Sequence, residues 1–190
     1  ENGGCIKAIN AKGCSGLPRK EIDGLAETAK TYGARGLLWI MYAGEGEIKS
    51  SLSKYLTNDE LNGILRKVSA QPGDLILIAA GEFEKTCDAM GHVRLELGNK
   101  LNLINKERYE LLWVVDFPLL EWSDEENRYV AKHHPFTAPK DEDIPLLDTD
   151  PGKVRAKAYD IVLNGTELGG GSIRIHTQEM QKKMFNILGF

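Results

Sequence analysis

The stretch YDIVLNGTELGGGSIRIH, from Tyr159 to His176, predicts two strands joined by a tight turn. Ile161 to Leu163 is β-branched and apolar, and Asn164-Gly165 is a strong hairpin signal because both residues tolerate a positive φ. Ser172 to Ile175 then resumes the composition of a strand. Gly169 to Gly171 lies between, and glycine inside a strand typically marks a bulge or a close approach of a ligand to bare backbone. The sequence therefore predicts a hairpin that is irregular at its triple glycine.

Three charged residues, Asp160, Glu167 and Arg174, follow one another at intervals of seven in this hairpin. Because a regular strand alternates its faces, residues seven apart on it point to opposite sides of the sheet. Glu167 and Arg174 share a face only if the ladder slips by one residue, and a bulge at the triple glycine would provide that slip. Each charge alone is typical of a solvated sheet face, but three charges around three glycines favour a site.

The charged residues suggest two kinds of chemistry. The guanidinium of Arg174 is a rigid fork that binds a carboxylate through two hydrogen bonds, and it discriminates against an amide because N–H groups would then face N–H groups. Asp160 and Glu167 flank the predicted turn, and Mg²⁺ commonly takes one or two protein carboxylates beside waters and phosphate oxygens. The alternatives are an Arg174 paired with a neighbouring strand carboxylate and two surface carboxylates beside a turn.

Composition narrows the class of protein. The 190 residues, 42% of them hydrophobic, can form one domain or two small ones, and the net charge of −4 argues against a free-standing nucleic-acid binder. No apolar run reaches the roughly 18 residues that span a bilayer, so we expect no membrane partner. Cys5, Cys14 and Cys87 lack a C-x-x-C spacing, which favours reduced thiols in a cytoplasmic protein. The chain begins at Glu1, and we interpret it as an excised fragment.

Residues 1–105 are predicted to form a compact α+β unit of helices on a small sheet. Three strands are expected, at residues 5–9, 37–42 and 75–80. Three helices are expected, one from Pro18, one from an N-cap at Asn58 and one over 82–97. Residues 43–53 are predicted to form a loop. This unit shows no nucleophile–base pair and no phosphate loop. Its residues alone indicate a structural or interaction module.

Residues 106–190 differ in composition and are predicted to be mainly antiparallel strands. Leu111 to Trp122 is strand-like, and a polar turn at 124–127 leads into a return strand. The Pro- and Asp-rich segment 136–152 is predicted to be a lid-like loop. A helix capped by Thr177 is expected to follow the hairpin 159–176.

Four strings in the chain resemble known families. NGTELGGGSIRIH (164–176) and HHPFTAPKDED (133–143) resemble the bacterial-type aspartyl-tRNA synthetases, which are class II aminoacyl-tRNA synthetases. LPRKEIDGLAETAKTYGARGL (17–37) and SAQPGDLILIAAG (69–81) resemble the GAD domain, which in that family interrupts the catalytic domain. The resemblance implies an α+β fold, with a GAD-type two-layer α/β insertion domain followed by part of a class II antiparallel-sheet catalytic domain.

The resemblance also implies a function. The parent protein would activate L-aspartate with ATP and Mg²⁺ to aspartyl-adenylate and transfer it to tRNA(Asp), as a cytoplasmic homodimer. His133 and Arg174 would bind aspartate, Glu167 would bind ATP, and Glu167 with Asp160 would hold Mg²⁺ through ATP. Of the two adjacent histidines only one can face the site from a strand, and the resemblance selects His133. No general base is evident, so no catalytic residue is assigned, and we expect the chain alone to be inactive because other family motifs are missing.

Two alternatives belong to other classes of function. One is an enzyme like the ATP-dependent aspartate–ammonia ligases, against which the GAD-like first half argues. The other is a non-catalytic module in which residues 1–105 bind tRNA or a protein partner. Absence of a charged cluster on the sheet of the second half would favour that module.

Overall fold

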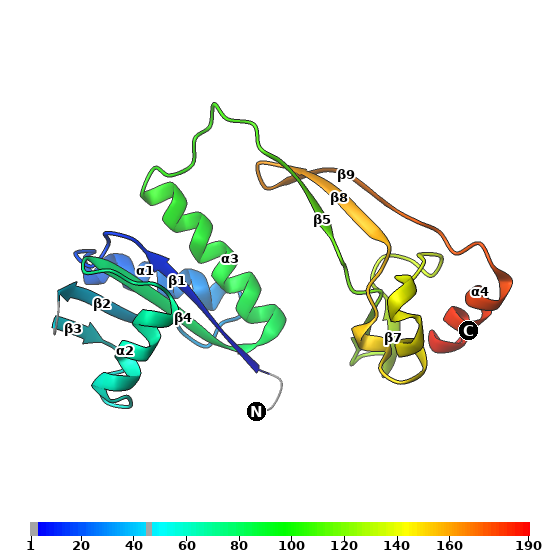
Figure 1. Ribbon diagram of the computed structural model, residues 1–190, viewed down its shortest axis with the longest axis horizontal. Helices are drawn as coiled ribbons and strands as arrows, with labels where there is room; N and C mark the ends of the chain where they lie inside the picture. The colour runs from blue at the N-terminus through cyan, green and yellow to red at the C-terminus, as the bar shows by residue number, and fades with distance from the viewer. Residues whose placement is uncertain (1–3, 45–46) are drawn as a thin grey trace. The chain divides into compact units, whose positions relative to one another are not determined.

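The computed structural model describes residues 4–44 and 47–190 and divides into two compact units, Glu1–Asn105 and Lys106–Phe190. Figure 1 shows that both units combine helices with antiparallel strands, so the mixed α and β character expected from the sequence is confirmed. Among the described residues, no helix has the length and apolar character needed to cross a membrane.

Unit 1 is built on a four-stranded antiparallel sheet with the strand order β1-β4-β2-β3. Its strands are β1 (Gly4–Ala11), β2 (Leu38–Gly44), β3 (Glu47–Ser50) and β4 (Asp74–Glu82). β4 is central and is buried from Asp74 to Ala79, which explains its unbroken apolar run. The loop predicted over 43–53 is wrong in part, because β3 pairs with β2 and Ile48 packs against the core. Residues 45 and 46 of that prediction lie outside the described residues.

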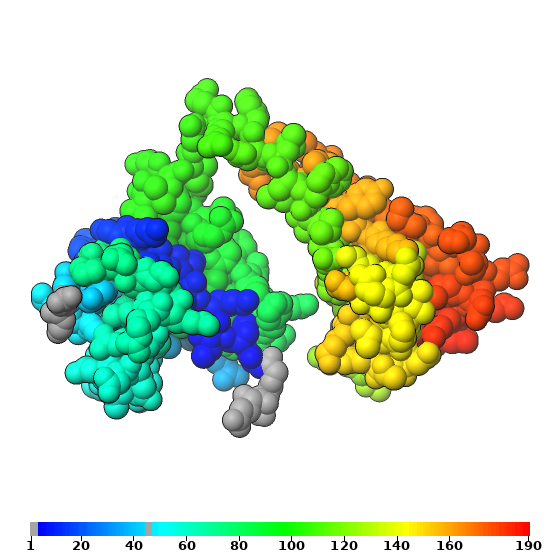
Figure 2. Space-filling model, in the orientation of Figure 1, coloured from blue at the N-terminus to red at the C-terminus, as the bar shows by residue number. Residues whose placement is uncertain are grey.

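Helices cover both faces of this sheet (Figure 1). Helices α1 (Arg19–Thr31) and α3 (Phe83–Lys100) pack with Leu75 and Leu77 of β4 on one face. Helix α2 (Asn58–Lys67) packs with Ile76 and Ile78 on the other face. The expected two-layer arrangement is therefore corrected to three layers, because the alternate residues of β4 require an apolar cover on each side. Figure 2 shows segments far apart in sequence, from blue to green, packed into this unit.

The N-cap of α2 is Thr57 rather than the predicted Asn58. The Thr57 hydroxyl accepts a hydrogen bond from the Glu60 N–H, and the Glu60 carboxylate accepts one from the Thr57 N–H at 2.8 Å. This reciprocal capping box satisfies two backbone donors, whereas a cap one residue later would satisfy fewer.

Unit 2 contains a three-stranded antiparallel sheet, β5-β8-β9, and a two-stranded sheet, β6-β7. Its elements are β5 (Leu111–Val115), β6 (Leu120–Ser123), β7 (Arg128–Ala131), η1 (Asp141–Asp148), η2 (Pro151–Lys153), β8 (Ala158–Leu163), β9 (Thr166–Ser172) and α4 (Gln178–Ile187), where η denotes a 3₁₀ helix. Its core gathers Leu120, Leu147, Val154, Met184 and Leu188. The predicted polar turn and C-terminal helix are confirmed.

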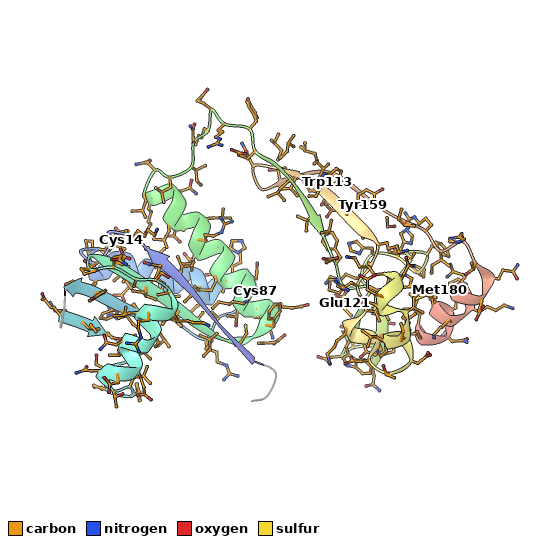
Figure 3. The ribbon with its side chains drawn as sticks, viewed as in Figure 1. Cys14, Cys87, Trp113, Glu121, Tyr159 and Met180 are labelled. Carbon is orange, nitrogen blue, oxygen red and sulfur yellow. The ribbon has the colours of Figure 1, made fainter. Side chains whose placement is uncertain are left out.

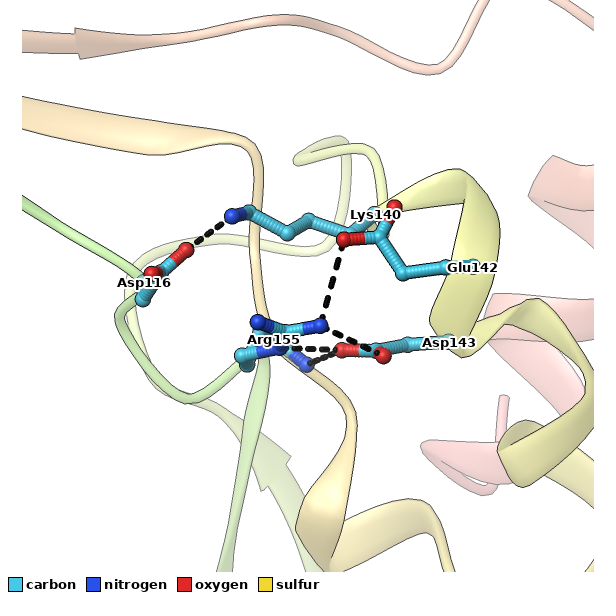
Figure 4. A network of polar contacts seen from close by, with 5 residues as sticks. All are labelled: Asp116, Lys140, Glu142, Asp143 and Arg155. Atoms are coloured by element: carbon cyan, nitrogen blue, oxygen red, sulfur yellow. Dashed lines mark hydrogen bonds and ion pairs between the residues drawn. The ribbon is translucent and has the colours of Figure 1, made fainter.

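The segment predicted as a lid-like loop, 136–152, is largely folded and contributes to the core. Most of it forms η1 and η2, and Asp143 and Leu147 are buried. Figure 4 shows what holds it: Arg155 donates from Nε and Nη2 to the two carboxylate oxygens of Asp143, at 2.7 and 2.9 Å. The backbone N–H of Arg155 donates to the same carboxylate at 2.9 Å, and Lys140 pairs with Asp116 nearby. The composition of the segment gave no sign of this anchor.

The Asp143 anchor predicts a specific loss of acid stability. Hydrogen bonds from the Arg155 side chain and backbone lower the pKa of Asp143 from 3.8 to about 2. A carboxyl whose pKa is depressed by folding stabilises the fold above pH 4, and this contribution is lost as the pH falls from about 4 to 2. We expect Asp143→Asn to lower the Tm at pH 7 by on the order of 5 °C, with the difference from wild type vanishing near pH 2.

Asp148→Asn is the matched control for this melting experiment, because Asp148 forms an exposed ion pair with Lys183. Its Tm should stay near that of the wild type at both pH values. A Tm difference for Asp143→Asn that is equally large at pH 7 and pH 2 would contradict the role given to this carboxylate.

Strand β5 is an edge of its sheet and is exposed along its whole length. Trp113 is 61% exposed, and its ring packs edge to face against Tyr159 of β8, with centroids 5.9 Å apart (Figure 3). All three cysteines are free thiols, with Cys14 buried and Cys5 and Cys87 half-buried. Burial, with a smaller contribution from Asp74, raises the pKa of the Cys14 thiol, which favours its protonated form.

Candidate functional site

The hairpin of β8 and β9 turns at Asn164-Gly165, as predicted. Both residues have positive φ, 48° and 84°, as a two-residue turn of this type requires. The Asn164 side chain also fixes the preceding linker: its Nδ2 donates to the Arg108 carbonyl, and its Oδ1 accepts from the Glu110 N–H, both at 2.9 Å. The turn residue thus positions the chain that leads into β5.

A bulge in β9 changes which residues share a face. Val162 pairs with Glu167 and Ile161 pairs with Gly169, so Leu168 is an extra residue in the ladder. Since paired residues lie on the same face, Glu167 joins the face that Asp160 shares with its partner Gly170. The predicted slip of one residue is confirmed, and it lies just before the triple glycine.

The same face carries a cavity of about 220 Å³ within unit 2. It is lined by His133, His134, Asp160, Glu167 and Arg174, with Ala158, Gly170, Gly171 and Ser172. All four residues predicted to bind ligands are therefore brought together. Arg174 is held there by its backbone, because Ile173 and Ile175 are hydrogen-bonded to the segment 136–138.

The three glycines have different neighbours. A Cβ at Gly170 would overlap the Asp160 carboxylate and lie 3.0 Å from its Cγ. A Cβ at Gly171 would lie 3.0 Å from the Tyr159 hydroxyl, whereas one at Gly169 would meet nothing within 4 Å. Gly170 and Gly171 are therefore required by side chains of the neighbouring strand, in addition to any ligand that approaches the sheet.

Both histidines line the cavity, which corrects the expectation that only one of them faces it. That expectation assumed a regular strand, but β7 ends at Ala131 and the chain bends through 132–135. His134, rather than His133, contacts the arginine: Arg174 Nη1 donates to His134 Nδ1 at 2.8 Å. The ring of His133 packs edge to face against Phe117, with centroids 5.0 Å apart.

His134 is held as a neutral acceptor. Its Nδ1 also accepts a hydrogen bond from the Phe136 N–H at 3.1 Å, so the ring proton belongs on Nε2. Burial first, and then the charges of Arg174 and His133, lower the pKa of His134. A neutral imidazole can therefore orient Arg174 at neutral pH. His134 was missed from sequence alone, although its position next to His133 was the available signal.

The charged groups of the cavity are not paired with one another. In the parts of the chain that the structure describes, Arg174 forms no ion pair with a carboxylate, and neither Asp160 nor Glu167 forms one with a cation. The alternative of an Arg174 satisfied by a strand carboxylate is therefore not what the structure shows. Apart from the hydrogen bond to His134, the guanidinium of Arg174 is available to bind a ligand carboxylate.

Asp160 and Glu167 offer a site for a hard cation only in combination with a ligand. No group of three metal-ligating side chains occurs among the described residues. Two carboxylates on one cavity wall suit Mg²⁺, which keeps several waters and takes its remaining ligands from phosphates. The donor set thus fits a metal ion carried by a nucleotide.

Comparison with known proteins shows what this chain is similar to. Residues 1–90 match the GAD domain family. Over all 190 residues the chain is 60% identical to an aspartate–tRNA(Asp/Asn) ligase of Caldanaerobacter subterraneus and 56% identical to an aspartate–tRNA ligase of Clostridium botulinum. Over 188 residues, 99% of the chain, it is 55% identical to an aspartate–tRNA ligase of Ruminiclostridium cellulolyticum. The chain spans 32% of the length of each of these relatives. Over almost its whole length, the chain is thus similar to one part of these aspartate–tRNA ligases.

Proposed function

We propose that this chain is the part of an aspartate–tRNA ligase that recognises aspartate and contributes carboxylates to ATP binding. The parent protein would form aspartyl-adenylate from L-aspartate and ATP and transfer the aspartyl group to tRNA(Asp). The observation that carries the proposal is the common face of β8 and β9, where Arg174, Asp160 and Glu167 line one cavity without ion pairs among themselves. The similarity over the whole chain supports it.

In this proposal Arg174 binds the side-chain carboxylate of aspartate. Two parallel N–H···O bonds fit the planar guanidinium, while an asparagine amide would leave donors facing donors. His134 holds the guanidinium through the 2.8 Å contact with its Nη1. His133 lines the same cavity and supplies a further polar contact to the amino acid.

Glu167 and Asp160 bind ATP and its Mg²⁺ in this proposal. Mg²⁺, when bound, neutralises charge on the triphosphate and on the leaving pyrophosphate. The chain itself contributes two carboxylates, and Gly170 leaves the space in which Asp160 lies. Binding aspartate and ATP in one orientation favours attack of the substrate carboxylate on the α-phosphate, and positioning of this kind accelerates the reaction without a general base.

Unit 2 would be a piece of a class II antiparallel catalytic domain. The exposed strand β5 supports this assignment, because a fully exposed apolar edge strand suits a sheet that continues into further chain. The family resemblance alone extends the proposal to a homodimer in the cytoplasm. The charged cluster on the sheet disfavours the non-catalytic module, and the GAD match disfavours the aspartate–ammonia ligase alternative.

Aspartate-dependent ATP–pyrophosphate exchange tests the proposed function. The full-length protein should exchange pyrophosphate with aspartate and far less with asparagine, and the 190-residue chain alone should show no exchange. A full-length protein that is inactive with aspartate but active with another amino acid would refute the proposal.

The neutral state of His134 predicts a pH dependence of aspartate binding. Protonation of Nδ1 removes the acceptor for Arg174 and places two cations side by side, so aspartate affinity should fall as the pH drops below 6.5. His134→Gln should weaken binding at pH 7.5 by about tenfold and flatten this pH profile. Binding measured by calorimetry from pH 5.5 to 8 gives the profile.

His133→Gln is the matched control for this pH profile, because His133 lines the cavity but forms no hydrogen bond to Arg174 in the described structure. The acid weakening should persist in this variant. If instead the profile is flat in the wild type, or only His133→Gln removes it, the role given to His134 is wrong.

A further inference from the structure

A second cavity, in unit 1, has no part in the function proposed above. It measures about 330 Å³ and lies where β4 ends and α3 begins, beside the turn that follows α1. Its lining includes Gly33, Arg35, Gly81, Glu82, Lys85 and Thr86.

The start of α3 forms one wall of this cavity. α3 has 18 residues, and the side chain of Glu82 at its N-cap accepts no hydrogen bond from a backbone N–H of the first turn. The first N–H groups of a helix have no partner within the helix, and together with the helix dipole they attract anions. Thr86, close to this helix start, also lines the cavity.

Thr86 is a buried residue whose hydroxyl has no hydrogen-bond partner among the described residues. The residue is 2% exposed and lines the cavity, and in the described residues no hydrogen bond to its Oγ1 is found. The hydroxyl lies over Gly81, because a Cβ at Gly81 would be 3.3 Å from it. The hydroxyl of a residue so little exposed is normally hydrogen-bonded, so an unpaired hydroxyl that borders a cavity points to a polar ligand.

The charged side chains around the cavity favour an anion. Arg35 is exposed and forms no ion pair within the described parts of the chain. Lys85 pairs with Glu82 at 2.7 Å, and the Lys85 stem passes over Gly33. The lining thus combines the cations Arg35 and Lys85 and the N-terminus of α3 with one carboxylate, that of Glu82. The electrostatic potential in the cavity is therefore positive.

We propose that this cavity binds a phosphate group, carried by a monoester or by the diester backbone of a nucleic acid. The N–H groups at the start of α3 and the Thr86 hydroxyl would donate to the phosphate oxygens, and Arg35 would add charge-assisted bonds. The site would give the GAD-like unit a ligand of its own. It stands independently of the aspartate cavity, since every residue involved belongs to unit 1.

Titration of the 190-residue chain with inorganic phosphate at constant ionic strength tests the proposal, with backbone amide NMR shifts as the readout. Saturable shifts are expected at Phe83 to Thr86. Arg35→Gln and Thr86→Val should each weaken binding by about fivefold or more. Arg94→Gln is the matched control, because it removes the same charge from an exposed position of α3 outside the cavity, and its affinity should be unchanged.

A second titration with a short single-stranded RNA distinguishes the two sources of phosphate. Shifts at the same amides that appear at lower concentration with RNA assign the site to a nucleic-acid backbone, and tighter binding of inorganic phosphate assigns it to a small phosphate ligand. Absence of saturable shifts with both ligands, or equal weakening by Arg35→Gln and Arg94→Gln, would overturn the proposal.

Discussion

Arg174→Lys in the full-length protein is expected to lower kcat/KM for aspartate by about 100-fold or more, with little change in the KM for ATP. Arg174 reaches the cavity as a planar fork, held by its backbone and by the contact with His134. Lysine keeps the charge but offers one ammonium group, so two parallel bonds to a carboxylate can no longer form. Discrimination between aspartate and asparagine should fall with it, because that discrimination depends on the paired geometry. Aminoacylation kinetics with both amino acids measure the effect.

Arg108→Lys provides the control for this substitution. Arg108 belongs to the same unit and forms an exposed ion pair with Glu110, away from the cavity lining. Its kinetics should match the wild type. If Arg174→Lys retains wild-type kcat/KM and selectivity, Arg174 does not read the side chain of the substrate.

Gly170→Ala is expected to reduce the rate of adenylate formation by about 10- to 100-fold. This range is typical of substitutions next to a metal ligand that disturb its position. The new methyl group would overlap the Asp160 carboxylate and lie 3.1 Å from the Tyr159 carbonyl oxygen. Asp160 must then leave the face that it shares with Glu167. The KM for Mg·ATP should rise more than the KM for aspartate, since Asp160 is assigned to the nucleotide and Arg174 stays in place.

Gly169→Ala is the matched control, one residue away in the same glycine run. Nothing lies within 4 Å of the added Cβ, and Gly169 has no positive φ. Adenylate formation should be close to that of the wild type. Equal losses in the two variants would mean that the glycine run matters for backbone freedom and not for the placement of Asp160.

The hairpin was predictable because its signals are local. Asn164-Gly165 fixes the turn, and the seven-residue spacing of Glu167 and Arg174 requires a slip that the structure places at Leu168. The apolar runs of β2 and β4 were equally clear: β4 is buried from Asp74 to Ala79, and β2 contributes the buried Ile40. The turn, the slip and these apolar runs were therefore predicted. The strand expected over Ser172 to Ile175 was wrong, because β9 runs from Thr166 to Ser172 with the glycines inside it.

The features that the sequence did not reveal depend on contacts between distant residues. Segment 136–152 has the composition of a loop, but Arg155 fixes Asp143 from outside it. His134 gains its role only because the chain bends after β7 and meets Arg174, 40 residues further on. Strand β3 is four residues long and too short for its alternation to stand out. Contacts between distant residues decided the first two cases, and the short length of β3 decided the third.

Equilibrium binding of L-aspartate and L-asparagine to the full-length protein, measured by calorimetry, tests whether Arg174, oriented by His134, makes this cavity a receptor for a side-chain carboxylate. Aspartate should bind at least about 100-fold more tightly than asparagine, and Arg174→Lys should remove that preference. Equal affinity for the two amino acids, or a preference that survives Arg174→Lys, would contradict this role of Arg174.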